Sequence, residues 1–110
     1  MKNSIQEKIR NVFALLQNKK VLLPKGIERE FVLDDQNGHY QLLNIGWQGS
    51  RYTHSVLLHL QSKDDFIWVQ IDNTEYEIVD KLLEQGVPED RIVLGFQAPL
   101  QRLLVVLQQV

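Results

Sequence analysis

The spacing of apolar residues is most regular between Phe66 and Gly86, where a strand pattern runs directly into a helix pattern. In the segment 66–71, aromatic and β-branched residues fill both alternating faces, which predicts a strand that is buried on most of its surface. Asp72 and Asn73 follow, and their side chains favour a turn because they bond nearby backbone groups.

The helix pattern begins after this turn. Thr74 stands three residues before Glu77, a spacing that predicts a capping box with Thr74 as the N-cap. Glu75 and Glu77 would then lie in the first helical turn, where the helix dipole favours negative charge. Gly86 is expected to end the helix. The apolar stripe between these signals consists of Ile78, Val79, Leu82 and Leu83.

The first part of the chain reads as one helix followed by three strands joined by short turns. An apolar stripe at helical spacing predicts a helix over Ser4–Asn18. Asn37-Gly38 is a strong hairpin signal. With the strand at 66–71, the short connections predict a four-stranded antiparallel meander. The three earlier strands are expected at Glu28–Leu33, His39–Trp47 and Tyr52–Gln61.

Strict alternation in the third strand would place His54, Val56, Leu58 and Leu60 on one face. His54 and His59 are five residues apart, so they would face opposite sides and could not share a metal ion through strand geometry. His39 lies at a turn. Three scattered histidines without cysteine are typical of surface or core-edge positions, and no metal site is predicted.

The expected architecture is α+β: one antiparallel sheet with an N-terminal helix and a second helix packed on it, forming a single domain over residues 1–110. A short apolar run, 92–96, is a strand or an extended segment. Pro99 could open a last segment, Leu100–Val110, in which the apolar run Leu103–Leu107 fits neither the helix nor the strand period cleanly. It would either bury an oligomer contact or close the protomer's own core.

Composition narrows the function classes. The formal net charge is −2, which is not the profile of a protein that coats nucleic acid. The absence of cysteine excludes disulfides and thiol catalysis. No run approaches the roughly 20 apolar residues of a membrane span, and no signal-peptide pattern opens the chain, so a cytoplasmic location is expected.

Few side chains suggest chemistry. Asp64, Asp65 and Asp72 flank the 66–71 strand, and such carboxylates serve acid–base catalysis or simply form turns; the turn interpretation is favoured. Trp47 and Trp68 are interpreted as core or interface residues. Arg51 is a candidate for binding an anion or a carboxylate. No nucleophile elbow and no phosphate-binding glycine loop is present, and no cofactor is predicted.

Six short blocks, in this order, resemble the XisI-like family, the fdxN element excision controlling factors of cyanobacteria. The resemblance covers roughly residues 34–102, with the N-terminal helix matching by position. Candidate interaction residues within the blocks are Trp47, Arg51, Trp68, Asp72, Thr74 and Glu75. The blocks are Tyr40-Gln41-Leu42-Leu43, Gly46-Trp47-Gln48-Gly49 with Arg51 and His59, Ile67-Trp68-Val69-Gln70, Asp72-Asn73-Thr74-Glu75, Gly86-Val87-Pro88-Glu89-Asp90 and Ile92-Val93-Leu94-Gly95-Phe96.

The resemblance implies a non-enzymatic accessory factor that controls programmed, heterocyst-related DNA excision through protein partners. A separate site-specific recombinase would cut and rejoin the DNA, and a XisH-like protein would be the direct partner. No catalytic residues are assigned to the family, so none is transferred to this chain. We also expect a homo-oligomer: if one sheet face is free of helices, self-association would cover it, with Trp47 or Trp68 as the anchor.

Two alternatives stay open. A direct DNA-binding factor would use a small basic patch made of Lys19, Lys20, Lys25 and Arg51, although the acidic balance of the chain argues against it. A small nuclease-associated subunit would instead use the acidic residues Asp64, Asp65, Asp72 and Glu75.

Overall fold

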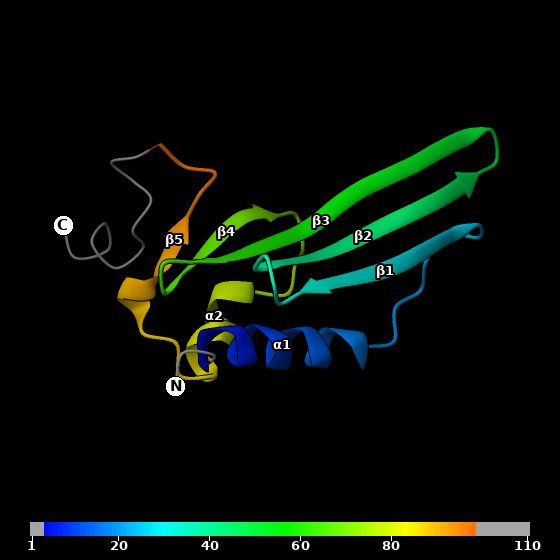
Figure 1. Cartoon of the computed structure of the whole chain (residues 1–110). Coiled ribbons are helices and arrows are strands. Elements are labelled where there is room, and N and C mark those ends of the chain that lie inside the picture. Colours follow the sequence, from blue (N-terminus) through cyan, green and yellow to red (C-terminus); the bar gives the residue numbers. More distant parts are fainter. Residues whose placement is uncertain (1–3, 99–110) are drawn as a thin grey trace.

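The computed structural model describes residues 4–98, which form two helices, five strands and one turn of 3-10 helix (Figure 1). None of the helices in this range is long and apolar enough to cross a membrane. The predicted last segment, Leu100–Val110, lies outside the described residues. In chain order the elements are α1 (Ser4–Gln17), β1 (Ile27–Asp34), β2 (His39–Gln48), β3 (Arg51–Lys63), β4 (Phe66–Asp72), α2 (Ile78–Glu84), η1 (Glu89–Arg91) and β5 (Ile92–Leu94).

The five strands form one sheet in the order β1-β2-β3-β4-β5. The first four make the predicted antiparallel meander. The α+β prediction is therefore confirmed, but the sheet has five strands rather than four. β5 runs parallel to β4 through the pairs Ile67–Ile92, Trp68–Val93 and Val69–Leu94. Parallel neighbours need a crossover connection, which α2 and η1 supply here.

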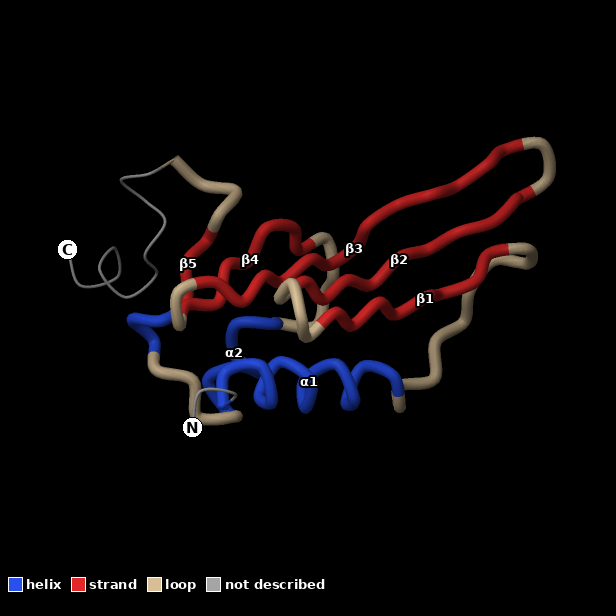
Figure 2. The backbone as a smooth tube through the Cα atoms, viewed as in Figure 1, coloured by secondary structure: helices blue, strands red, loops and turns tan. Residues whose placement is uncertain are grey.

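Within residues 4–98, both helices lie on the same face of the sheet (Figure 2). The buried stripe of α1 meets the inward-facing residues of the central strands, and Ile78 and Leu82 of α2 extend the same core. Aromatic rings join the two layers: the Phe13 ring lies 6.2 Å from both the Phe31 and the Tyr40 ring. The opposite face of the sheet carries no helix from this part of the chain.

Two β-bulges interrupt the alternation that the sequence suggests. Leu42 pairs with Leu58 but Leu43 pairs with Val56, so Leu57 is an extra residue in β3. Leu58 and Leu60 face the helices, whereas His54 and Val56 face the other side. The prediction of one continuous face was wrong, because each extra residue reverses which side the following residues occupy. Gln70 is the corresponding extra residue in β4, between the partners of His59 and Leu60.

The predicted capping box at the start of α2 is also wrong. The helix begins at Ile78, and its N-cap is Glu77, in a left-handed conformation (φ 54°) with no side-chain cap. Thr74 instead takes part in a turn: its backbone N–H and its hydroxyl both donate to Asp72 Oδ1, at 3.0 and 2.7 Å. This local turn binds the threonine hydroxyl before the helix starts, so Glu75 and Glu77 lie outside the first helical turn.

The predicted end of α2 is confirmed. Gly86 has a φ of +92°, its N–H donates to the Leu83 carbonyl, and the Val87 N–H donates to the Leu82 carbonyl. This pair of bonds is a Schellman motif, which favours glycine because a side chain is strained at positive φ.

The turn between β1 and β2 is tied to α1 by a small polar network. Asp35 Oδ1 accepts hydrogen bonds from the Tyr40 hydroxyl at 2.6 Å and from Arg10 Nη1 at 2.7 Å. The Tyr40 hydrogen bond, and then the Arg10 cation, hold the pKa of Asp35 below its ordinary value of 3.8. Because the folded state favours the ionised carboxylate, this network stabilises the fold above that pH and loses its contribution as the pH falls through the lowered pKa.

Tyr40→Phe is expected to cost about 1 kcal/mol of unfolding free energy at pH 7, since it removes one hydrogen bond to a carboxylate. The difference from the wild type should shrink between pH 4 and pH 2, as Asp35 becomes protonated (its ordinary pKa is 3.8). Urea unfolding at several pH values measures this. Tyr76→Phe is the matched control, because the Tyr76 hydroxyl accepts its hydrogen bond from the Arg29 guanidinium, at 2.9 Å, and that group stays charged throughout this pH range. An equal pH trend in both variants would contradict the prediction.

Candidate interaction site

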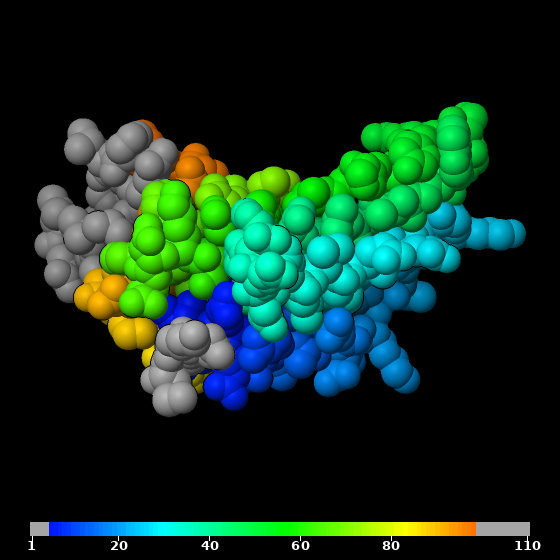
Figure 3. Space-filling view, in the orientation of Figure 1, coloured from blue at the N-terminus to red at the C-terminus, as the bar shows by residue number. Residues whose placement is uncertain are grey.

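The hairpin of β2 and β3 extends beyond the rest of the sheet (Figures 1 and 3). Its tip carries exposed aromatic residues. Gly46 is the last residue of β2 that pairs with β1, so Trp47 and Tyr52 pair only with each other. Their rings lie 5.1 Å apart, and they are 58% and 54% exposed. Trp47 was expected at a core or an interface position, and this exposure excludes the core.

Arg51 stands beside these two rings and pairs with Gln48 across the turn. Its side chain is exposed, and no described residue forms an ion pair with it. It is the single charged residue between Ile45 and Val56, counting histidine as neutral. We call Trp47, Arg51 and Tyr52 the hairpin tip. The structure brings two sequence-predicted candidates together there, and it adds Tyr52, which sequence reasoning missed although the hairpin register makes it the neighbour of Trp47.

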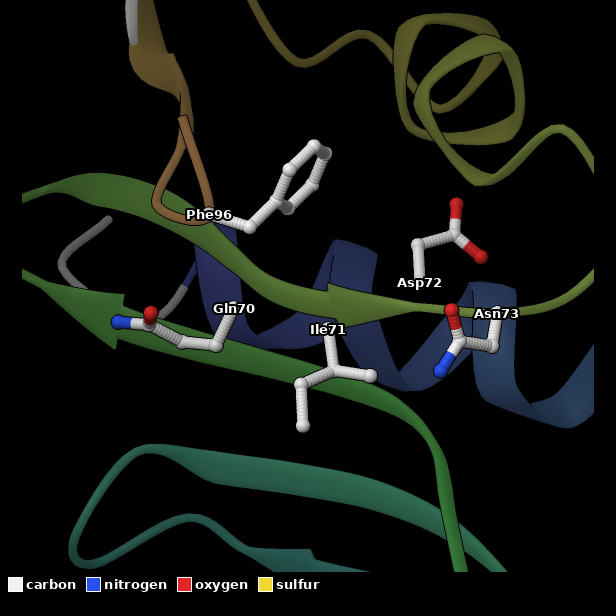
Figure 4. A pocket seen from close by; sticks show the side chains of 5 residues that line it. All are labelled: Gln70, Ile71, Asp72, Asn73 and Phe96. Carbon is white, nitrogen blue, oxygen red and sulfur yellow. The ribbon is translucent and has the colours of Figure 1, made fainter. Parts of the chain in front are cut away.

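A groove of about 380 Å³ lies along the end of β4 (Figure 4). Gln70, the bulged residue of β4, lines the groove, and its Nε2 donates a hydrogen bond to Gln61 Oε1 at 3.0 Å. The Phe96 side chain, which follows β5, also lines the groove and is 56% exposed. Asp72 is the one ionisable residue in the lining, and its Oδ1 atom already accepts two hydrogen bonds from Thr74. The groove consists of Gln70, Ile71, Asp72, Asn73 and Phe96.

The other candidates lie apart from these two sites or have local structural roles. Trp68 is half-buried on β4, with the Lys63 ammonium 5.5 Å from its ring. It packs against Gly95, where an added Cβ would lie 3.3 Å from Trp68 Cε3. Thr74 belongs to the Asp72 turn, and Glu75 is an exposed bend residue next to it.

The acidic residues are not gathered into a cluster. Asp64 and Asp65 form the tight turn between β3 and β4, with φ of 56° and 65°, while Asp72 lies at the far end of β4. Positive φ at both central positions is typical of a hairpin turn and accounts for these two aspartates. Nowhere in residues 4–98 do three histidine, cysteine or carboxylate groups approach closely enough to hold a metal ion.

The histidines are arranged differently from the prediction. His54 and His59 pair with Ile45 and Gln41, which lie on the same side of β2, so both histidines occupy the helix-free face. The Leu57 bulge is the reason. His59 meets His39 instead: His39 Nδ1 lies 3.0 Å from His59 Nε2. Burial, and then the proximity of His39, lower the pKa of His59, which favours its neutral form.

Comparison with known proteins agrees with this fold. The family model described as XisI protein matches residues 1–106. A crystal structure of a XisI-like protein from Anabaena variabilis has 32% identity and a TM-score of 0.76, covering 92% of this chain and 90% of that one. The structure of fdxN element excision controlling factor XisI from the same organism has 33% identity and a TM-score of 0.69, covering 91% and 92%. Among curated proteins, none matches this chain.

Proposed function

This chain belongs to the XisI family, and from that premise we propose that it is an excision controlling factor that acts by binding other proteins rather than by catalysing a reaction. The hairpin tip is the proposed contact surface. One of the two similar structures is of an fdxN element excision controlling factor, which supports a role in controlling the excision of a DNA element.

The observation that carries this proposal is the composition and exposure of the hairpin tip. Tryptophan, tyrosine and arginine are the residue types most enriched among those that dominate binding energy in protein interfaces. All three stand together here, beyond Gly46, the last residue of β2 that pairs with β1. Large aromatic side chains held apart from a protein's own core are typical of a surface that a partner covers.

The chemistry of the groove supports a binding role over a catalytic one. General acid–base and nucleophilic catalysis require at least two reactive groups within hydrogen-bonding reach of a reacting atom. The groove offers one carboxylate, Asp72, which Thr74 already engages. Direct DNA binding finds little support, because the hairpin tip carries a single cation and the chain is acidic overall.

We propose a XisH-like protein as the direct partner, with the site-specific recombinase reached through that complex. The helix-free sheet face is the proposed surface for self-association. The half-buried residues Leu43, Ile45 and Val56 lie on it, and they continue from the hairpin tip toward the centre of the sheet. A two-fold axis would make such a face its own partner.

Trp47→Ala is expected to weaken binding to the XisH-like protein by about thirtyfold, which corresponds to a hot-spot loss of about 2 kcal/mol. Isothermal titration calorimetry with purified partner measures the change. Phe96→Ala is the matched control, because Phe96 is equally exposed at 56% but lies in the groove. The control should bind normally. Loss of affinity in Phe96→Ala alone would move the contact to the groove.

Two further readouts separate parts of this proposal. Wild-type protein that forms no complex with the XisH-like protein would reject that partner, whatever the hairpin tip does. Sedimentation of the free protein at micromolar concentration tests self-association independently: an oligomer is expected, and a stable monomer would contradict that part of the proposal.

A further inference from the structure

The contact between His39 and His59 has the geometry of half a transition-metal site. The two residues lie on adjacent strands at diagonal positions, since His39 pairs with Gln61 and Gln41 pairs with His59. Both side chains face the helix-free side of the sheet, and their ring centroids are 5.1 Å apart. The atoms that converge, His39 Nδ1 and His59 Nε2, are the ring nitrogens through which imidazoles bind metals.

From this geometry we propose that His39 and His59 bind one Zn²⁺ ion, each as a neutral imidazole. Zinc–nitrogen bonds are about 2.0–2.1 Å long, so two ligands at the tetrahedral angle have nitrogens about 3.3–3.4 Å apart. The present separation is 3.0 Å. Side-chain rotation can open the pair by a few tenths of an ångström. The proton of the present hydrogen bond moves to the other nitrogen of its own ring, so that both facing nitrogens are free to bind the metal.

Both histidines are half-buried, and residues of the neighbouring strands flank them. Gln61 is fixed by the hydrogen bond from Gln70, and Ile71 pairs with His59 from β4. Among residues 4–98, no third histidine, cysteine or carboxylate joins the pair, so water completes the coordination. The site therefore suits borderline metals that accept imidazole, such as Zn²⁺, Ni²⁺ and Cu²⁺, and not Mg²⁺, which prefers oxygen ligands.

The test is calorimetric titration of the untagged full chain with Zn²⁺ alone. The sequence contains three histidines and no cysteine, so His54 is the only other imidazole. We expect the wild type to bind Zn²⁺ at one site. In His39→Gln and in His59→Gln the affinity for Zn²⁺ should fall at least about tenfold. Losing a residue that only supports a metal ligand already costs about that much, and each of these variants loses a ligand itself. The matched control His54→Gln should bind like the wild type. Mg²⁺ should release no binding heat.

A second measurement does not depend on the variants. In long-range imidazole ¹H–¹⁵N spectra of the wild type, Zn²⁺ should shift His39 Nδ1 and His59 Nε2 and leave both His54 nitrogens in place. The melting temperature should also rise with Zn²⁺ concentration in the wild type and not in His59→Gln. The assignment is overturned if the wild type releases no binding heat, if either single variant binds as tightly as the wild type, or if His54 shifts instead.

Discussion

Gly46→Ala is expected to destabilise the protein by about 3 kcal/mol or more, one of the largest losses that a single methyl group can cause here. Gly46 has a φ of +146°, and a Cβ at this position would lie 1.9 Å from the Gly26 carbonyl oxygen. That oxygen belongs to the backbone, so it cannot move aside without separating the start of β1 from β2. Gly26 has no room for a side chain either, since an added Cβ would lie 2.0 Å from the Trp47 carbonyl oxygen.

Gly49→Ala is the matched control for this prediction. Gly49 lies in the hairpin turn with a φ of +63°, and nothing lies within 4 Å of its added Cβ. Its substitution should cost only the left-handed backbone penalty of about 1–2 kcal/mol. Urea unfolding followed by circular dichroism compares the two variants. Similar losses in both would mean that the close approach of Gly26 and Gly46 contributes little to stability.

This pair of glycines also places the hairpin tip. Gly46 pairs with Ile27, the first residue of β1, and is the last residue of β2 that pairs with β1. Trp47 follows directly after it. A Gly46→Ala variant that still folds is therefore expected to displace the exposed rings as well. The proposed contact surface depends in this way on a backbone approach that only glycine permits.

Phe13→Ala is expected to cost about 3–5 kcal/mol, the range for removing a buried aromatic side chain from a core. Phe13 is fully buried in α1, and its ring contacts Phe31 and Tyr40 across the interface between helix and sheet. A loss of this size is a large part of the roughly 5–15 kcal/mol by which a domain is stable. At 37 °C the variant should be partly unfolded, which thermal denaturation would show as a lower and broader transition.

Leu15→Ala tests whether this effect depends on burial. Leu15 lies two residues further along α1 and is 47% exposed, so its loss should stay below about 1 kcal/mol. A loss in Leu15→Ala as large as that in Phe13→Ala would contradict the prediction that burial against the sheet determines the cost of the substitution. Helix propensity cannot explain such an outcome, since alanine is the better helix former than either residue.

The residues that stabilise the fold and the residues of the two proposed binding sites lie in different parts of the protein. The core is built from α1, α2 and the inner face of the sheet, whereas the hairpin tip and the His39–His59 pair lie outside it. Substitutions at Trp47 or His59 are thus expected to change binding without unfolding the protein. This separation makes the two binding proposals testable with folded variants.

The sequence alone predicted much of the local structure. The apolar stripe of α1, the strand pattern of β4 and the Gly86 signal after α2 each depend on residues close together in the chain. Such patterns reflect periodicity and backbone preference, which act over a few residues. The order of the six blocks was also sufficient to identify the family.

Only the tertiary structure decided which side chains meet. The bulge at Leu57 reverses the facing of half of β3, so His54 and His59 share one face, and the bulge at Gln70 does the same in β4. The parallel pairing of β5 and the contact between His39 and His59 join residues 20 or more positions apart. A bulge depends on the register of the whole strand pair, which is set by how the inward-facing apolar residues of both strands pack against α1 and α2. No pattern within a single strand contains that information.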